Sequence, residues 1–223
     1  MGRTRRKRKR NQSKNGKKKS LKQLFSEKRY DAIVERFSRA GPTIGDENRR
    51  VVARSLANLD KHQEAGSCYF KICIQTAGDL IDAAKSFISA KDWELATESA
   101  KDAIKLTPSA NAYLILAKAN ERDDYGSSCT YSSQIDLLEK AVDFADATPE
   151  IFLWLAELYF YESEFSDAPR TDPFADGVLR FGLERHPASR ELRCACIRDA
   201  LYKKHDFLAV SYTHLTLPTI LLV

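Results

Sequence analysis

The residues with the strongest chemical character are cations, and eleven of them stand within residues 1–19 without an acid. Flexible Lys and Arg side chains neutralise phosphates or other anions without reading a base sequence. No aromatic residue is interleaved with them, so base stacking is not indicated. The formal net charge is +5, and setting these eleven cations aside leaves −6 for residues 20–223. The sequence therefore predicts an acidic body that carries a basic arm, with RNA or DNA as candidate partners of the arm.

The candidate anion-binding and nucleic-acid-binding residues of the arm are Arg5, Arg6, Lys7, Arg8, Lys9, Arg10, Lys17, Lys18 and Lys19. Residues 1–20 hold almost nothing to bury, so we expect a disordered arm. It lacks the apolar core of a secretory signal. We therefore expect a cytoplasmic protein with five reduced cysteines, and in a eukaryotic cell the run Arg5 to Arg10 would favour nuclear import. A solubilising arm that docks on the acidic body is the alternative.

The rest of the sequence contains no catalytic motif: no Gly-rich phosphate loop, no Gly-x-Ser-x-Gly and no His-Glu-x-x-His. His62 and His186 stand at expected turns, where histidines cap helices more often than they bind metals. Cys194 and Cys196 would point about 200° apart on a helix, so they cannot chelate one ion. The longest apolar run of the central chain, from Ile151 to Ala156, is too short to cross a bilayer. We predict no enzyme, no catalytic residue, no metal and no cofactor.

Helical periodicity begins at Leu21, where apolar residues start to recur at spacings of three and four. The pattern breaks at Gly41-Pro42, Thr107-Pro108, Thr148-Pro149 and His186-Pro187. These breaks bound units of similar length, which indicates an internal repeat. The sequence therefore predicts an all-α protein built from repeated helices.

Residues 77–108 show the repeated unit most clearly. One face of a first helix and one face of a second are given by Leu80, Ala83, Ala84 and Phe87, followed by Ala96, Ala100 and Ala103. The pair Asp92-Trp93 marks the turn between them, and Pro108 ends the second helix. Small side chains at Ala84 and Ala96 would let two antiparallel helices approach closely.

This unit resembles a tetratricopeptide repeat (TPR), in which large, small and aromatic residues alternate at these positions and a Pro closes the repeat. Residues 46–76, 110–148 and 149–187 fit the same frame, residues 21–41 fit half of it, and residues 190–207 supply a further first helix. The resemblance implies a right-handed superhelical solenoid of about five antiparallel helix pairs over residues 21–207. Its seam residues would be Ala53, Ala65, Ala84, Ala96, Ala117 and Ala156.

The resemblance also implies a concave groove lined by the first helices. The groove candidates are Arg50, Arg54, Lys85, Lys118, Ile81, Leu114 and Leu153, with Glu157 in the last repeat position. Three successive cations one repeat apart would form a positive stripe that favours an acidic peptide or a C-terminal carboxylate. The arrangement resembles the carboxylate clamp of chaperone-binding family members, but the Lys/Asn set of that clamp is not intact here.

Residues 208–223 leave the pattern and are expected to be a non-native or unstructured tail. From Val210 onward the sequence resembles the translation of a sequencing-adapter read, which would make the chain a fragment of a longer protein. A genuine C-terminal strand or a partner-bound tail is the alternative. Three functions stay open: a protein–protein interaction scaffold, the N-terminal targeting module of a truncated enzyme such as a transferase, and an RNA- or ribosome-associated factor.

Overall fold

The computed structural model describes residues 19–40, 44–120, 131–165 and 173–204, and these residues form eleven α-helices and no strand. The all-α prediction is confirmed for this part of the chain. Most of the predicted basic arm, residues 41–43, 121–130 and 166–172, and the predicted tail from residue 208 lie outside the described residues.

The helices follow one another in antiparallel pairs, and short connections at residues 107–109, 143–148 and 186–189 coincide with three of the predicted breaks. In chain order they are α1 (Leu21–Ser26), α2 (Tyr30–Ala40), α3 (Asp46–Ala57), α4 (His62–Phe70), α5 (Ala77–Ser89), α6 (Trp93–Leu106), α7 (Ala110–Ala119), α8 (Tyr131–Val142), α9 (Pro149–Phe165), α10 (Pro173–Arg185) and α11 (Arg190–Lys204). Each helix packs on the next one, so five pairs and a further first helix stack into one array.

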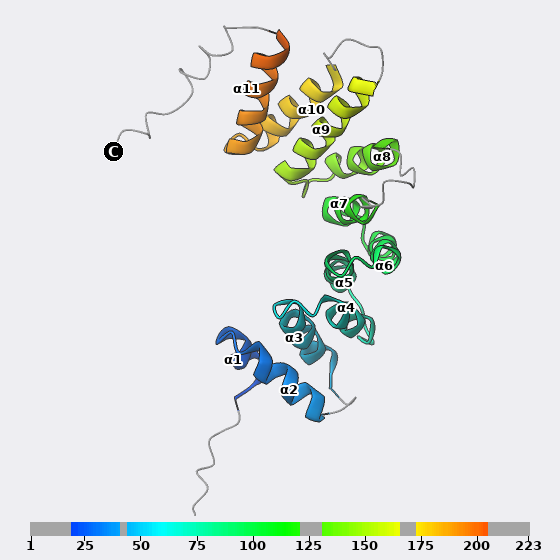
Figure 1. Cartoon of the computed structure of the whole chain (residues 1–223), viewed down its shortest axis with the longest axis vertical. Helices are drawn as coiled ribbons and strands as arrows, with labels where there is room; N and C mark the ends of the chain where they lie inside the picture. The colour runs from blue at the N-terminus through cyan, green and yellow to red at the C-terminus, as the bar shows by residue number, and fades with distance from the viewer. Residues whose placement is uncertain (1–18, 41–43, 121–130, 166–172, 205–223) are drawn as a thin grey trace, which may run out of the picture.

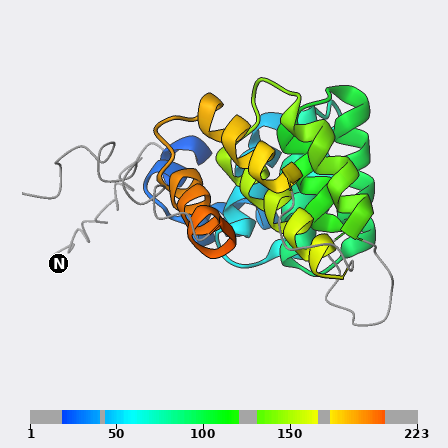
Figure 2. The same cartoon turned by 90° about the horizontal axis from the view of Figure 1, so that it is seen from above.

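The array curves into an arc, and along α1 to α8 the odd-numbered first helices form its inner side (Figure 1). Among the first helices of the whole array, α1 contacts α3, α5 contacts α7, and α9 contacts α11. In Figure 1 the central helices α5 to α7 are seen nearly end-on, whereas α9 to α11 are seen from the side. Figure 2 shows the central helices lengthwise, so the helix axes rotate along the array as they do in a superhelical solenoid.

Local sequence signals set the helix boundaries in the central unit. The Thr76 side chain accepts a hydrogen bond from the backbone N–H of Asp79, whose carboxylate in turn accepts from the backbone N–H of Thr76. This reciprocal capping box starts α5. Asp92 caps α6 through the N–H of Leu95, and Ser109 caps α7 in the same way.

The turns inside three successive helix pairs share one backbone feature. Lys28, Asp60 and Lys91 adopt positive φ angles of 56°, 57° and 61° between the first and second helices of their pairs. A residue with a side chain is strained in this left-handed region by about 1–2 kcal/mol. The same conformation recurs at the same place, so the antiparallel reversal of the chain requires it.

The seam between helices is lined by small side chains. All six predicted seam alanines are at most 1% exposed. Two glycines extend the same principle, because Gly66 of α4 lies against the ring of Phe87 and Gly182 of α10 lies against the root of the Phe152 side chain. A Cβ added at either glycine would lie 2.6 or 2.8 Å from the buried aromatic residue, which is too close for two carbon atoms.

Candidate partner-binding face

The predicted groove cations of α3 are paired with acids on the next first helix, α5. Arg50 donates to both carboxylate oxygens of Asp79 at 2.8 Å, through its Nε and Nη2 atoms. The Arg54 guanidinium lies 3.6 Å from the Asp82 carboxylate. These pairs therefore hold neighbouring repeats together, and they neutralise the charges that the sequence assigned to a ligand.

Asp79 is the most buried acid of this contact, with 4% of its side chain exposed. Burial opposes its ionisation, but hydrogen bonds from Arg50 and Thr76 outweigh burial and hold the pKa of Asp79 below its ordinary value. The pKa of Arg50 is correspondingly raised by the hydrogen bond to Asp79. A bidentate pair of this kind fixes the relative register of α3 and α5.

Further hydrogen bonds from α3 immobilise the loop that connects α4 to α5. The Asp46 carboxylate accepts from the backbone N–H groups of Cys73 and Ile74, and these bonds lower its pKa. Arg49 donates to the carbonyl of Lys71, and Arg50 also donates to the carbonyl of Ile74. The polar side chains at the start of α3 thus form hydrogen bonds with the α4–α5 loop and with α5. The Cys73 side chain in this loop is exposed.

Two apolar groove candidates are core residues. Ile81 is 7% exposed and Leu114 is 4% exposed, because α5 and α7 pack closely together. Their side chains are enclosed between these helices, and their role as groove residues stays a prediction. Lys85 is exposed on α5, where no acid pairs with it among the described residues.

The third cation of the predicted stripe, Lys118 of α7, pairs with Glu150 at the start of α9 at 2.5 Å. Both side chains are partly exposed, at 35% and 56%. This contact is of the type that contributes little to stability. Its position matters more, because Glu150 marks the edge of a hollow on the inner side of the array.

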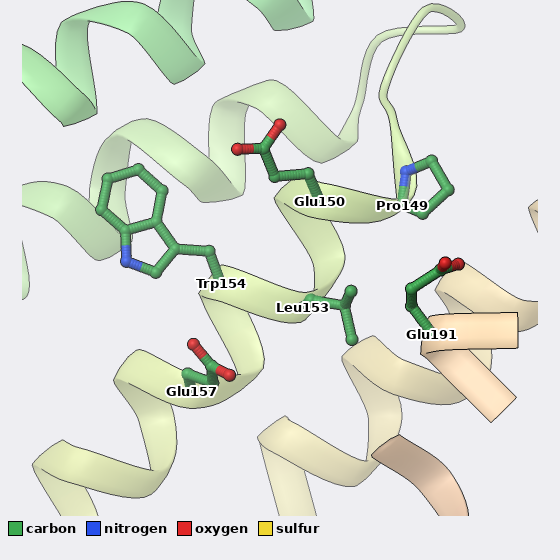
Figure 3. Close-up of a pocket in the computed structure, with 6 residues that line it drawn as sticks. All are labelled: Pro149, Glu150, Leu153, Trp154, Glu157 and Glu191. Atoms are coloured by element: carbon green, nitrogen blue, oxygen red, sulfur yellow. The ribbon is translucent and has the colours of Figure 1, made fainter. Parts of the chain in front are cut away.

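That hollow is a pocket of about 420 Å³ between the first turns of α9 and α11. It is lined by Pro149, Glu150, Leu153, Trp154, Glu157 and Glu191. In Figure 3 Leu153 projects from α9 toward the side where Glu191 begins α11, while Trp154 forms the wall on the other side of α9. The pocket lining therefore combines apolar surface with three carboxylates, those of Glu150 and Glu157 on α9 and that of Glu191 on the α11 side, beyond Leu153.

Contacts from the α10–α11 connection hold the start of α9 in place. Arg185 donates to the carbonyls of Val142 and Phe144, and the ring Nε2 of His186 lies 2.8 Å from the carbonyl oxygen of Ala147. These carbonyls lie in or next to the loop that precedes α9, and Pro149 begins α9 directly after it. The hydrogen bonds therefore fix the position of the helix that lines the pocket. His186 is thus used in packing and hydrogen bonding.

The pocket carboxylates differ in their surroundings. Glu191 accepts a hydrogen bond from the Ser189 hydroxyl at 3.0 Å, and hydrogen bonds from its own backbone and from Ser189 lower its pKa, so it is ionised at neutral pH. Glu157 lies 4.0 Å from Arg198, which is itself 60% exposed. The cations beside the pocket, Lys118 and Arg198, are therefore held only by exposed pairs that a ligand can exchange.

The described residues contain no group of three or more His, Cys, Asp or Glu side chains arranged to hold a metal ion. Nor do they include a helix that is both long and apolar enough to span a membrane.

Comparison with known proteins identifies the fold. No family model and no curated protein matches the chain. Solved structures do match: the C-terminal part of a TPR repeat-containing protein from Cytophaga hutchinsonii is 19% identical, with a TM-score of 0.63 over 87% of this chain and 75% of that one. The fold is TPR-like.

Two further structures have the same architecture. TTC0263, a TPR protein of Thermus thermophilus, is 21% identical with a TM-score of 0.52, over 81% of this chain and 95% of its own. YrrB, described as a TPR protein with an unusual peptide-binding site, is 10% identical with a TM-score of 0.56, over 77% and 85%. At these identities the likeness concerns the fold of the TPR-like array.

Sequence reasoning found Leu153 and missed most of the pocket around it. Trp154, which the repeat pattern does not mark as a groove position, is only partly buried and lines the pocket. Glu150 and Glu191 were not singled out, because each belongs to a helix start where acids are common. The pairing of the α3 cations could have been predicted from the sequence. Asp79 and Asp82 follow Arg50 and Arg54 by about one repeat length, which places them on the next first helix.

Proposed function

We propose that this chain is a protein-interaction scaffold that binds a segment of a partner protein in the pocket between α9 and α11. The observation that carries the proposal is the pocket itself, which combines Leu153 and Trp154 with three carboxylates on the inner side of the array. First helices of such arrays present a continuous inner surface, and a shallow apolar hollow on it suits a peptide side chain.

The chemistry of the lining favours a basic segment over the acidic peptide that the sequence suggested. A Lys or Arg side chain can lay its methylene stem on Leu153 while its charged end meets Glu157 or Glu191. An acidic segment would have to displace Asp79, Asp82 or Glu150 from three of the four predicted cations, and Asp79 is buried in a bidentate pair. Lys85 is the exposed cation on which an acidic ligand would depend.

The test is an array of immobilised peptides, screened with the full chain and with two variants. Trp154→Ala should weaken binding of the selected peptides about tenfold or more, because buried aromatic contacts dominate such interfaces. Phe174→Ala is the matched control, since Phe174 is a 67% exposed aromatic residue on the second helix α10. Equal loss in both variants, or no loss in either, would overturn the proposal.

The same array separates the two ligand chemistries. Basic peptides that depend on Trp154 support the pocket. Acidic peptides that are lost in Lys85→Glu and retained in Trp154→Ala would instead place the ligand on α5, as the positive-stripe hypothesis predicts.

A further inference from the structure

We propose that the chain's own basic arm, residues 1–18, binds in the pocket between α9 and α11 and covers it until a competing partner displaces it. The inference concerns the same pocket as the proposed function and adds a regulatory occupant to it. The arm would then compete with partner proteins for binding in this pocket.

Charge complementarity is the first support. Residues 1–18 carry ten Lys and Arg side chains and no acid, while Glu150, Glu157 and Glu191 line one pocket. Lys118 pairs with Glu150 at 2.5 Å and Arg198 lies 4.0 Å from Glu157, and both pairs are exposed to solvent. A guanidinium that binds two carboxylate oxygens at once makes a stronger contact than such single pairs.

The inner face is also divided in a way that directs the arm to this end. Near the N-terminal end, the acids Asp79 and Asp82 are already bound by Arg50 and Arg54, and Lys85 stands exposed beside them. Asp79 is only 4% exposed and is closed to a further cation, whereas Glu150, Glu157 and Glu191 line an open pocket at the opposite end of the arc.

The apolar part of the pocket suits the arm as well. Arg and Lys stems cover apolar surface while their charged ends stay at the rim. Trp154 offers an indole face, the aromatic surface that attracts a guanidinium most strongly. The run from Arg5 to Arg10 supplies six consecutive long cationic side chains, so several registers of the arm present a suitable stem.

The arm is long enough to reach the pocket from its own molecule. Extended chain spans up to about 3.3 Å per residue, which gives roughly 60 Å for eighteen residues. Four steps between neighbouring first helices, from α1 to α9, cover about 40 Å at roughly 10 Å a step, and the curvature of the arc shortens the direct path (Figure 1). A tether of this length holds the arm at millimolar effective concentration, so even a weak contact is populated.

The experiment uses the full chain with the photo-crosslinking residue p-benzoylphenylalanine at position 153. Irradiation at low salt should join position 153 to peptides from residues 3–18, and mass spectrometry identifies them. The same residue at position 174, on the outer helix α10, is the control. A cross-link to the arm that is equally abundant from both positions would overturn the proposal, since it would show no preference for the pocket.

A competition measurement gives an independent readout. A fluorescent peptide of residues 1–19 should bind the full-length variant in which residues 5–10 are all Gln at least about tenfold more tightly than the unaltered chain, whose pocket is occupied. Adding Glu150→Gln, Glu157→Gln and Glu191→Gln should remove this binding. The matched control neutralises three exposed acids of the second helices, Glu94, Glu98 and Glu184, and should retain it.

The outcomes separate this inference from the proposed function. Equal peptide affinity in the unaltered and arm-neutralised chains, with binding still dependent on Trp154, would leave the pocket as a partner site and overturn self-binding. If neither chain binds any basic peptide, both proposals fail. If the arm cross-links in neither position and the chain is retained on RNA at moderate salt, the arm serves nucleic acid directly.

Discussion

The two ends of the array join their first helices with the same types of residue, but in different surroundings. Between α3 and α5 the contact is the bidentate pair Arg50–Asp79, in which the side chains are 23% and 4% exposed. Between α7 and α9 it is the single bond of Lys118 to Glu150, whose side chains are 35% and 56% exposed. The first pair is sealed between helices, and the second lies at the rim of an open pocket.

The difference shows that a place on the face of the first helices does not by itself assign a charge to structure or to ligand binding. Arg50 and Lys118 are both predicted groove cations of first helices, yet Asp79 is buried and Glu150 lines the pocket. Where an acid of the next helix is buried, the cation becomes part of the interior. Where the acid is exposed, the acid and the cation both stay hydrated and can bind a partner.

The largest effect is expected from Asp79→Ala. It leaves the guanidinium of Arg50 without its bidentate partner in a largely buried site and also removes half of the α5 capping box. We expect a loss of about 3 kcal/mol in the free energy of unfolding. Urea denaturation followed by circular dichroism measures it, with Glu150→Ala as the exposed counterpart, for which we expect at most about 1 kcal/mol. Equal losses would break the comparison.

The pH dependence of stability sharpens the same point. The pKa of Asp79 is lowered by folding from an ordinary value of 3.8, so its contribution is complete above about pH 4 and is lost as the pH falls through the lowered value. Asp79→Asn should therefore be less stable than the unaltered chain at pH 7, and the gap should be smaller at pH 3. A gap that is the same at both pH values would show that ionisation of Asp79 is not the source.

Two glycines of one helix should respond in opposite directions. An added Cβ at Gly182 would lie 2.8 Å from the Cβ and Cγ of Phe152, the rigid root of a fully buried side chain. Gly182→Ala should cost about 1–3 kcal/mol. At Gly177 a Cβ meets nothing within 4 Å, so Gly177→Ala should stabilise α10 by up to about 1 kcal/mol. Thermal unfolding distinguishes the two, and a stabilising Gly182→Ala would refute the close packing of α9 on α10.

The smallest effect is expected from Lys118→Met. The pair it removes is partly exposed, so the free energy of unfolding should change by less than about 1 kcal/mol and the change should shrink as salt is added. Chemical denaturation at low and high salt measures it. A loss as large as that of Asp79→Ala would mean that the pocket acids are structural.

Much of the fold could be predicted because it depends on local spacing. The periodicity of Leu80, Ala84 and Phe87 predicted α5, Asp92 marked the following turn, and Ala96 predicted the seam of α6. All three apolar side chains of α5 and the Ala96 side chain are buried. Short-range patterns of this kind survive in the structure because each helix buries one face regardless of its partner.

The candidate site was less accessible to prediction. Leu153 was found because it shares a repeat position with Ile81 and Leu114, yet the close approach of α5 to α7 buries the other two. Glu191 belongs to the next repeat and reaches the pocket only through the placement of α11 on α9. Such neighbours depend on the angle between helices, which no local pattern specifies.

The sequence by itself determined that the described part of the chain would form paired helices with small residues at their crossings, because the helical period and the volume of each side chain are properties of the sequence alone. The tertiary structure decided which charges would be enclosed and which would remain exposed. That choice depends on the distance between groups about thirty residues apart and on the water left between them, and both arise only when the repeats stack.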